Sequence, residues 1–295
     1  MSRPIDVMII GAQKAGTTSL LRYLGEHPEC MSHPQKEFAY FIDTKEYDNN
    51  YTRAFRKYFS ASDVTSNAKI VAKSAGLYAD ENAIKRLYEH NPKCELIIIL
   101  RNPVERAYSS YLMEKNYDSV KFEFSELPEL IQKHNGNDES WGFSFFIEYG
   151  FYAKHLKNIY KHFPKEQVHV ILYEEFKNNT LKVCQDIFNV IKIDNKFIPN
   201  VKVQHNVTQK MHSQFYAKLT KHILKKEGFF RRLFLKIIPT NKAYKYGEQL
   251  RLINKKNAKH SEMNDSEKQY LITFYKPHND ELENLIKCDL SNWNK

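Results

Sequence analysis

The chain has 295 residues, 42% of them hydrophobic and 14% aromatic, so it can bury one sizeable core, and we expect a single domain over residues 1–295. Its 45 Lys and Arg outnumber its 35 Asp and Glu, and the formal charge of +10 favours an anionic ligand, a nucleic acid or an acidic membrane surface without choosing among them. No apolar run reaches the ~18 residues that span a bilayer, so we expect no transmembrane helix. No CxxC pair is present, so we expect neither a zinc knuckle nor a disulfide framework.

The predicted elements alternate between strands and helices. A short apolar run at residues 6–10 predicts a strand that ends at Gly11, and periodic leucines after Thr18 predict a helix. Further strands are expected at residues 94–100, where the apolar content indicates burial, and at residues 167–172. This alternation is typical of an α/β fold with a central parallel sheet flanked by helices and connected by right-handed crossovers.

Two more helices and one irregular stretch complete the pattern. Apolar residues recur with helical spacing between residues 152 and 160 and stop before Pro164, and a final helix is expected at residues 267–286. Residues 200–245 are less regular and rich in Lys and Arg, which indicates a surface excursion.

A loop of small residues, GAQKAGTTSL at residues 11–20, joins the first strand to its helix. Small residues let the backbone wrap around an anion, the N–H groups at the helix start point at it, and Lys14 adds a charge, so the loop predicts a phosphate cradle. The pattern departs from the GxxxxGK[ST] of nucleotide triphosphatases because Thr17, not a lysine, follows Gly16. A magnesium triphosphate is therefore disfavoured, and a plain strand-to-helix turn is the other interpretation.

Arg101 and Ser109 form a second candidate anion site. Arg101 follows the strand at residues 94–100, and Ser109 lies about two turns into the helix that Pro103 can start. Ligands of open α/β sheets lie outside the carboxyl ends of the strands, so this pair and the cradle can grip two phosphates of one ligand. A capped helix with a salt-bridging arginine is the alternative.

Together these segments resemble the PAPS-dependent sulfotransferases, where PAPS is 3′-phosphoadenosine 5′-phosphosulfate. GAQKAGTTSL is similar to their 5′-phosphosulfate loop, and LRNPVERAYSSY to their 3′-phosphate-binding segment. Further similarity, closest to the heparan-type and bacterial carbohydrate sulfotransferases, is found at residues 33–41, 73–74, 150–152, 163–164 and 274–279 and at Leu282 and Leu285. The resemblance implies a P-loop-like sulfotransferase fold and in-line transfer of the sulfuryl group to a hydroxyl or amine of a carbohydrate or small-molecule acceptor, with 3′,5′-adenosine bisphosphate as product.

The resemblance also assigns ligand-binding roles. Lys14 is matched to the lysine that contacts the transferring group, and Arg101 and Ser109 to the residues that hold the 3′-phosphate. Lys210, in the loop at residues 204–213, is matched to a basic loop that closes over the same phosphate. The residues matched to the 5′-phosphate site are Ala15, Gly16, Thr17, Thr18 and Ser19.

Two residues are candidates for the general base. Glu37 stands before an aromatic pair as the glutamate of the heparan-type enzymes does, and a carboxylate within hydrogen-bond reach can take the proton of the acceptor. His33 is the rival, since other sulfotransferases use a histidine and imidazole titrates near neutrality. Lys73 matches a lysine near the acceptor and the transferring group, but Ser-Ala follows it where the family has Thr-Pro.

Two other functions stay open. A kinase or nucleotide triphosphatase would bind ATP with Mg²⁺, and a non-catalytic polyanion or nucleic-acid binder would need a basic stripe, whereas the basic residues are scattered among acidic ones. We expect no metal, because sulfuryl transfer needs none and no ligand cluster stands out.

Three expectations concern the surroundings of the site. The basic and apolar run at residues 229–238 either packs on the core or contacts a membrane or an anionic acceptor. The aromatic residues between 141 and 146 line an acceptor cleft or belong to the core. Because the first strand begins where Golgi members of the family carry a membrane anchor, we expect a soluble, cytoplasmic enzyme.

Overall fold

The computed structural model describes residues 2–59, 67–116, 119–134, 142–202 and 263–295, together with the backbone of two short strands, Lys210–Met211 (β6) and Lys255–Lys256 (β7). Contacts divide the chain into two compact units, one made of residues 1–110, 123–206 and 264–295 and the other of residues 111–122 and 207–263. In the second unit, β6 and β7 pair antiparallel. The single domain over residues 1–295 stays a prediction.

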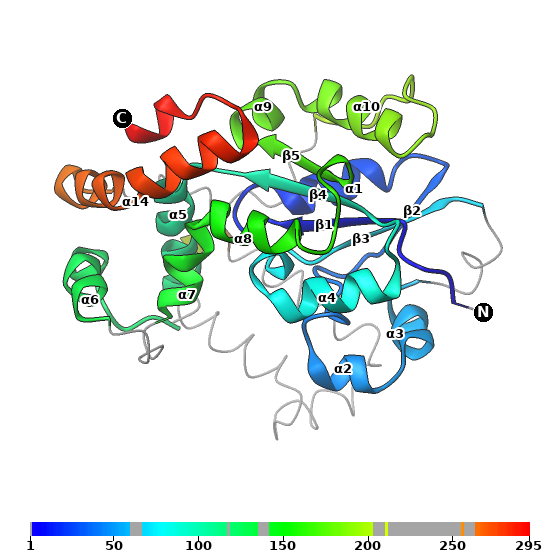
Figure 1. Cartoon of the computed structure of the whole chain (residues 1–295), viewed down its shortest axis with the longest axis horizontal. Coiled ribbons are helices and arrows are strands. Elements are labelled where there is room, and N and C mark those ends of the chain that lie inside the picture. Colours follow the sequence, from blue (N-terminus) through cyan, green and yellow to red (C-terminus); the bar gives the residue numbers. More distant parts are fainter. Residues whose placement is uncertain are drawn as a thin grey trace. The chain divides into compact units, whose positions relative to one another are not determined.

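A five-stranded sheet forms the centre of the first unit (Figure 1). The strands are β1 (Val7–Gly11), β2 (Cys30–Ser32), β3 (Lys69–Lys73), β4 (Glu95–Leu100) and β5 (Val168–Leu172). Their order is β2-β3-β1-β4-β5, and every pair is parallel, which confirms the predicted α/β fold. The sequence pattern finds β1, β4 and β5 but misses the other two, because β2 has only 3 residues and the 5 residues of β3 begin and end with lysine.

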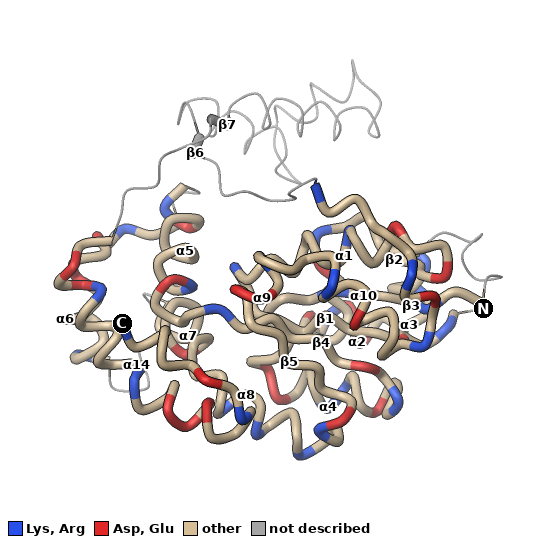
Figure 2. The backbone as a smooth tube through the Cα atoms, turned by 90° about the horizontal axis from the view of Figure 1, so that it is seen from above, with Lys and Arg blue, Asp and Glu red and all other residues tan. Residues whose placement is uncertain are grey.

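Helices cover both faces of the sheet. Figures 1 and 2 show α1, α9 and α10 on one side and α4 and α8 on the other. Their bounds are α1 (Thr17–Leu24), α4 (Glu81–His90), α8 (Tyr152–Ile159), α9 (Tyr173–Asn178) and α10 (Thr180–Val190). Every residue of β1 is buried, and so is every residue of β4 after its first, as a parallel sheet between two helical layers requires.

The remaining helices are α2 (Thr44–Asp48), α3 (Tyr51–Tyr58), α5 (Pro103–Asn116), α6 (Leu127–Lys133), α7 (Phe143–Phe146) and α14 (Asp265–Ile286). Short 3₁₀ turns lie at Leu77–Ala79, Phe124–Glu126, Glu148–Gly150, Lys165–Gln167 and Ser291–Asn294. Helix α14 confirms the predicted last helix and begins slightly earlier, because Asn264 and Glu267 form a capping box at its start.

Several sequence expectations fall outside the described residues. They concern Trp141, the surroundings of Lys210 at residues 203–209 and 212–213, and the run at residues 229–238; the side chain of Lys210 itself is also undescribed. Within the described helices, none has the length and apolar character needed to cross a bilayer.

The carboxyl ends of the strands lead to the predicted site residues. Lys73 is the last residue of β3, and Arg101 directly follows β4. Strand β1 leads into the loop that carries Lys14, and β2 leads into the segment that carries His33 and Glu37. Because parallel strands end on the same edge of a sheet, residues from distant parts of the sequence meet there.

Candidate active site

The loop after β1 has the curvature expected of an anion cradle. Lys14 and Gly16 both have positive φ angles, of 71° and 84°. The Ala15 N–H donates to the Ala12 carbonyl at 3.1 Å, and the Ala12 N–H donates to the Ile99 carbonyl at 2.8 Å. The loop is therefore anchored on β4, the strand that leads to Arg101.

Helix α1 begins directly at the end of this loop. No side chain caps its N-terminus, and no acidic residue lies in its first turn. The first N–H groups of a helix lack partners within the helix and form the positive end of its dipole, which favours an anion. The residues at this end are Thr17, Thr18 and Ser19, so the local structure agrees with their predicted role, which stays a prediction.

Position 16 favours glycine. A Cβ atom there would lie 3.0 Å from the ring of Phe176 and 3.6 Å from that of Tyr173, both on α9. A side chain would also be strained at the positive φ angle of Gly16. Sequence reasoning missed both aromatic residues, although they follow β5 much as Arg101 follows β4.

Arg101 contacts the cradle directly. Its Nη1 donates to the Lys14 carbonyl at 3.1 Å, and its guanidinium lies 4.9 Å from the centre of the Tyr173 ring. Its Nε and Nη2 donate to Oε2 of Glu105 at 3.1 and 2.8 Å. The two predicted anion-binding motifs therefore meet. The Glu105 side chain is 54% exposed, so this ion pair is weak and a phosphate can displace the carboxylate at little cost.

Helix α5 is tied to the cradle through the serine next to the predicted one. Ser110 is fully buried and donates to Oε1 of Gln13 at 3.1 Å, whereas Ser109 is half-buried. The contact between Ser110 and Gln13 was missed by sequence reasoning, and the doubled serine was its only signal. Ser109 as a ligand of the 3′-phosphate stays a prediction.

Glu37 and Lys73 form an ion pair at the end of β3. Nζ of Lys73 lies 2.6 Å from Oε1 of Glu37, and the Ala75 N–H donates to Oε2 at 2.9 Å. The Lys73 side chain is 1% exposed and that of Glu37 is 39% exposed. A carboxylate oxygen accepts more than one hydrogen bond, so Glu37 can also accept a proton from a group at its exposed side.

Burial lowers the pKa of Lys73, and the carboxylate of Glu37 opposes this effect. The Lys73 side chain is therefore buried against a partner that favours its charged form. The backbone supports the same geometry, since the Phe38 N–H donates to the Lys73 carbonyl at 2.6 Å. The departure from the family's Thr-Pro after Lys73 has not displaced it from Glu37.

His33, the rival base, is fully buried beside this pair. Its Nε2 accepts the Lys73 N–H at 3.2 Å, and its Nδ1 lies 3.0 Å from the Gln35 carbonyl. Burial lowers the pKa of His33 to about 4. Both ring nitrogens are occupied by backbone groups, so the geometry favours Glu37 over His33 as the base, an assignment that stays a prediction.

Neighbouring strands place the ion pair beside the cradle. Lys73 is in register with Ile9 of β1, and the Ser74 N–H donates to the Ile9 carbonyl at 3.0 Å. Adjacent strands lie about 4.8 Å apart. Arg22 of α1 donates to the Pro34 carbonyl at 2.7 Å, so the helix that starts at the cradle also holds the segment that carries Glu37. Sequence reasoning missed Arg22.

Among the residues that the structure describes, no three His, Cys, Asp or Glu side chains are grouped so as to hold a metal ion. The expectation of a metal-free reaction stays a prediction. Along the described chain, the positions of Lys and Arg are interspersed with those of Asp and Glu (Figure 2).

Comparison with known families decides among the functions left open. Residues 4–235 match the family described as "Sulfotransferase domain". The chain belongs to this family. Membership confirms the predicted enzyme, a sulfotransferase, and removes the basis for the kinase and for the non-catalytic polyanion binder.

Curated relatives agree with this assignment. The bifunctional heparan sulfate N-deacetylase/N-sulfotransferase 3 of Homo sapiens is 24% identical over 286 residues, which cover 95% of this chain and 29% of that protein. The heparan sulfate glucosamine 3-O-sulfotransferase 5 of Homo sapiens is 30% identical over 171 residues, which cover 56% of this chain and 46% of that protein. The chain therefore spans less than half the length of these relatives.

A solved structure supports the fold. The crystal structure of a sulfotransferase from Alicyclobacillus acidocaldarius superposes with a TM-score of 0.66 at 23% identity and covers 100% of both chains. This similarity confirms the predicted sulfotransferase fold.

Proposed function

We propose that the protein transfers the sulfuryl group of PAPS to a hydroxyl or amine of a carbohydrate acceptor, with Glu37 as the general base. The observation that carries the proposal is the ion pair of Glu37 and Lys73, which stands one strand away from the cradle that contains Lys14. A base and two lysines thus lie at one edge of the sheet, next to the start of α1.

The groups around the cradle suit a cosubstrate with two phosphates. The N-terminus of α1 and Lys14 would hold the 5′-phosphosulfate, and Arg101 would exchange Glu105 for the 3′-phosphate. All of these groups are cations or N–H donors. The ring of Tyr173, stacked on Arg101, borders the same region.

The chemistry follows from these positions. The acceptor oxygen or nitrogen forms a bond to sulfur while the bond from sulfur to the phosphate oxygen breaks. The acceptor proton passes to Glu37, and the electron pair of the broken bond stays on the phosphate, which leaves as 3′,5′-adenosine bisphosphate. Lys14 and the N–H groups of the loop stabilise the charge on that leaving oxygen.

The acceptor class is inferred from the relatives. Two of them are named for the N- or O-sulfation of heparan sulfate, and one name specifies glucosamine. We therefore propose a glucosamine-containing saccharide that offers a free amine or a hydroxyl. A cytoplasmic location stays a prediction.

Calorimetric titration with 3′,5′-adenosine bisphosphate, beside ATP with Mg²⁺, tests the cosubstrate. We expect micromolar binding of the bisphosphate and none of ATP. Binding of ATP alone would overturn the proposal.

Transfer from [³⁵S]PAPS tests the acceptor. A glucosamine oligosaccharide with free amines and its N-acetylated counterpart separate the two chemistries, because only the first can be sulfated on nitrogen. We expect label on at least one of them, and transfer that is slower by about 10²- to 10⁴-fold with Glu37→Gln. Binding of the bisphosphate without transfer to either saccharide would keep the cosubstrate and contradict the acceptor class.

A further inference from the structure

His33 bridges the two segments that form the ion pair. Its Nε2 accepts the Lys73 N–H at 3.2 Å, at the end of β3, and its Nδ1 lies 3.0 Å from the Gln35 carbonyl, in the segment that carries Glu37. Because Nε2 faces an N–H group, Nε2 carries no hydrogen, so the hydrogen of the neutral ring lies on Nδ1 and is donated to Gln35. One neutral tautomer satisfies both contacts.

The same histidine cannot exchange protons with an acceptor molecule. The ring is fully buried, and the rings of Phe38, Tyr58 and Phe59 surround it with centroid distances of 6.0, 5.7 and 5.9 Å. The charged groups near it are Lys73 of β3 and Arg22 of α1, which both disfavour a second proton. Any influence of His33 on the reaction must pass through the groups that it holds.

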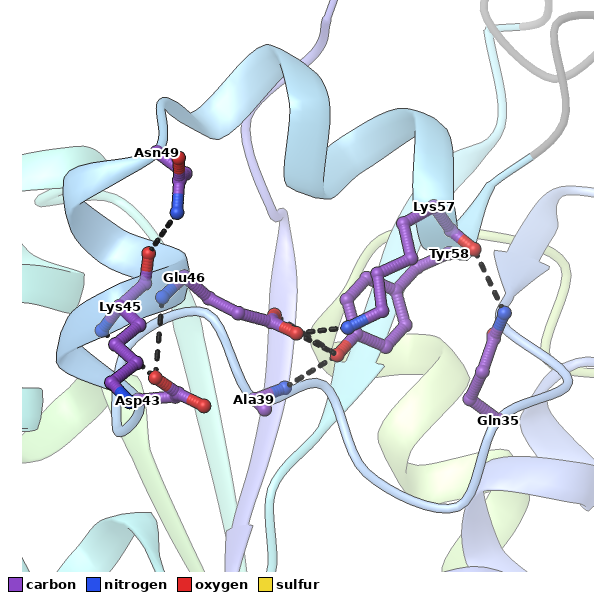
Figure 3. A network of polar contacts seen from close by, with 8 residues as sticks. All are labelled: Gln35, Ala39, Asp43, Lys45, Glu46, Asn49, Lys57 and Tyr58. Carbon is purple, nitrogen blue, oxygen red and sulfur yellow. Dashed lines mark hydrogen bonds and ion pairs between the residues drawn. The ribbon is translucent and has the colours of Figure 1, made fainter. Parts of the chain in front are cut away.

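Helix α3 contacts the segment on both sides of Glu37, and Figure 3 shows these contacts at Gln35 and Ala39. The Gln35 side-chain amide donates to the Lys57 carbonyl at 2.9 Å, and the Ala39 N–H donates to the hydroxyl of Tyr58 at 3.3 Å. The Tyr58 hydroxyl in turn donates to Oε2 of Glu46, 3.1 Å away, and Glu46 also pairs with Lys57. Glu37 lies midway between the two anchored residues, so the segment has little freedom to move it.

Both backbone groups of Lys73 form hydrogen bonds with the segment that carries His33 and Glu37. Its N–H reaches His33, and its carbonyl accepts the Phe38 N–H at 2.6 Å. The end of β3 and the segment that carries Glu37 are therefore joined twice. The Lys73 peptide contacts His33 and Phe38, and the Lys73 side chain contacts Glu37.

We propose that His33 is a positioning residue: its neutral imidazole, which contacts the Gln35 carbonyl through Nδ1, accepts the Lys73 N–H through Nε2, and this second contact sets the geometry of Lys73 and Glu37. The inference rests on the proposed function for its effect on turnover. The bridge itself is independent of that function.

Two near-isosteric variants separate the contacts. The amide of His33→Gln extends to the position of Nε2 and can still accept the Lys73 N–H, whereas the shorter amide of His33→Asn reaches only the position of Nδ1. We expect kcat for [³⁵S]PAPS with the glucosamine oligosaccharide to fall no more than a few-fold in His33→Gln and about 10- to 100-fold in His33→Asn. The KM for PAPS and the affinity for 3′,5′-adenosine bisphosphate should stay unchanged in both.

Amide hydrogen exchange provides a readout that needs no activity. Exchange in a peptide that contains residues 70–76 should accelerate in His33→Asn and stay near the wild-type rate in His33→Gln. His90→Gln is the matched control, since the Nε2 of His90 likewise accepts a backbone N–H, that of Ile5 at 3.2 Å, away from the site. It should change stability but not kcat.

Tyr58→Phe keeps the ring but removes the hydroxyl that accepts the Ala39 N–H. This variant replaces the histidine variants in the test if they do not fold. We expect kcat to fall a few-fold with the KM for PAPS unchanged.

Three outcomes would overturn the proposal. Equal, large losses of kcat in His33→Gln and His33→Asn with normal exchange at Lys73 would assign the ring a direct role in proton transfer. Wild-type kcat in His33→Asn would show that the contact of His33 with Lys73 has no effect on turnover. Wild-type hydrogen exchange at residues 70–76 in His33→Asn would show that the contact does not hold the Lys73 N–H. If the wild-type chain does not bind the bisphosphate, the proposed function fails, yet the exchange experiment still decides whether the bridge exists.

Discussion

The cradle and the ion pair stand side by side but are built in different ways. The cradle is one continuous loop whose shape comes from small residues, two positive φ angles and the start of α1. The ion pair joins residues 36 positions apart and depends on β2, β3 and α3 to bring them together. A contiguous loop keeps its shape through its own backbone, whereas an assembled pair is only as well placed as the elements that support it.

The largest effect should come from the base. Replacing Glu37 with Gln removes the charge that accepts the proton but keeps the shape, and we expect kcat to fall by about 10²- to 10⁴-fold. The affinity for 3′,5′-adenosine bisphosphate should not change, because the cradle is separate. Single-turnover transfer from [³⁵S]PAPS and calorimetry measure the two quantities. Normal transfer would move the base role to another residue.

Lys14→Ala tests the cradle, and we expect it to lower kcat. The lysine stabilises charge on the leaving oxygen, and the loss of one such donor costs about 10²- to 10³-fold in kcat. The melting temperature should stay within a few degrees, because the loop is anchored by backbone hydrogen bonds. Lys177→Ala, an exposed lysine on α9, is the control. Near-wild-type turnover in Lys14→Ala would contradict the cradle.

Arg101→Ala should weaken binding rather than chemistry. Charge-assisted hydrogen bonds contribute about 1.5–3 kcal/mol, so the affinity for 3′,5′-adenosine bisphosphate should drop about 10- to 100-fold. Glu105→Gln, which frees the guanidinium from its present carboxylate, should bind the bisphosphate at least as well as the wild type. Calorimetry on both variants tests the exchange, and equal losses in the two would show that Glu105 helps to hold the ligand.

Acid should weaken the supports of the ion pair. Burial holds the pKa of His33 at about 4, whereas an exposed histidine has a pKa near 6.5, so the unfolded chain takes up a proton first as the pH falls. The contribution to the free energy of unfolding therefore declines below about pH 6.5, and we expect a loss of about 1 kcal/mol by pH 5.5. Urea unfolding of the wild type and of His33→Gln at pH 7.5 and 5.5 measures it. Equal declines in the two would contradict this assignment.

Some of the site is readable from the residues alone because it is local. The conformation of Lys14, Gly16 and the first turn of α1 depends on residues that are adjacent in the sequence. The apolar run of β4 predicts both a buried strand and the position of Arg101 at its end. The predicted strands and helices at these places are confirmed, and the family match agrees with the motifs.

Tertiary structure decided the rest. Strands β2 and β3 are too short or too polar at their ends for a pattern to reveal them, yet they carry His33, Glu37 and Lys73 to one edge of the sheet. The contacts of Tyr173, Ser110 and Arg22 likewise join residues that no spacing relates. Short motifs determine a local backbone conformation, and hence an anion cradle, through the sequence itself. A buried charge and a histidine between two peptide groups acquire their roles only from neighbours that the fold supplies.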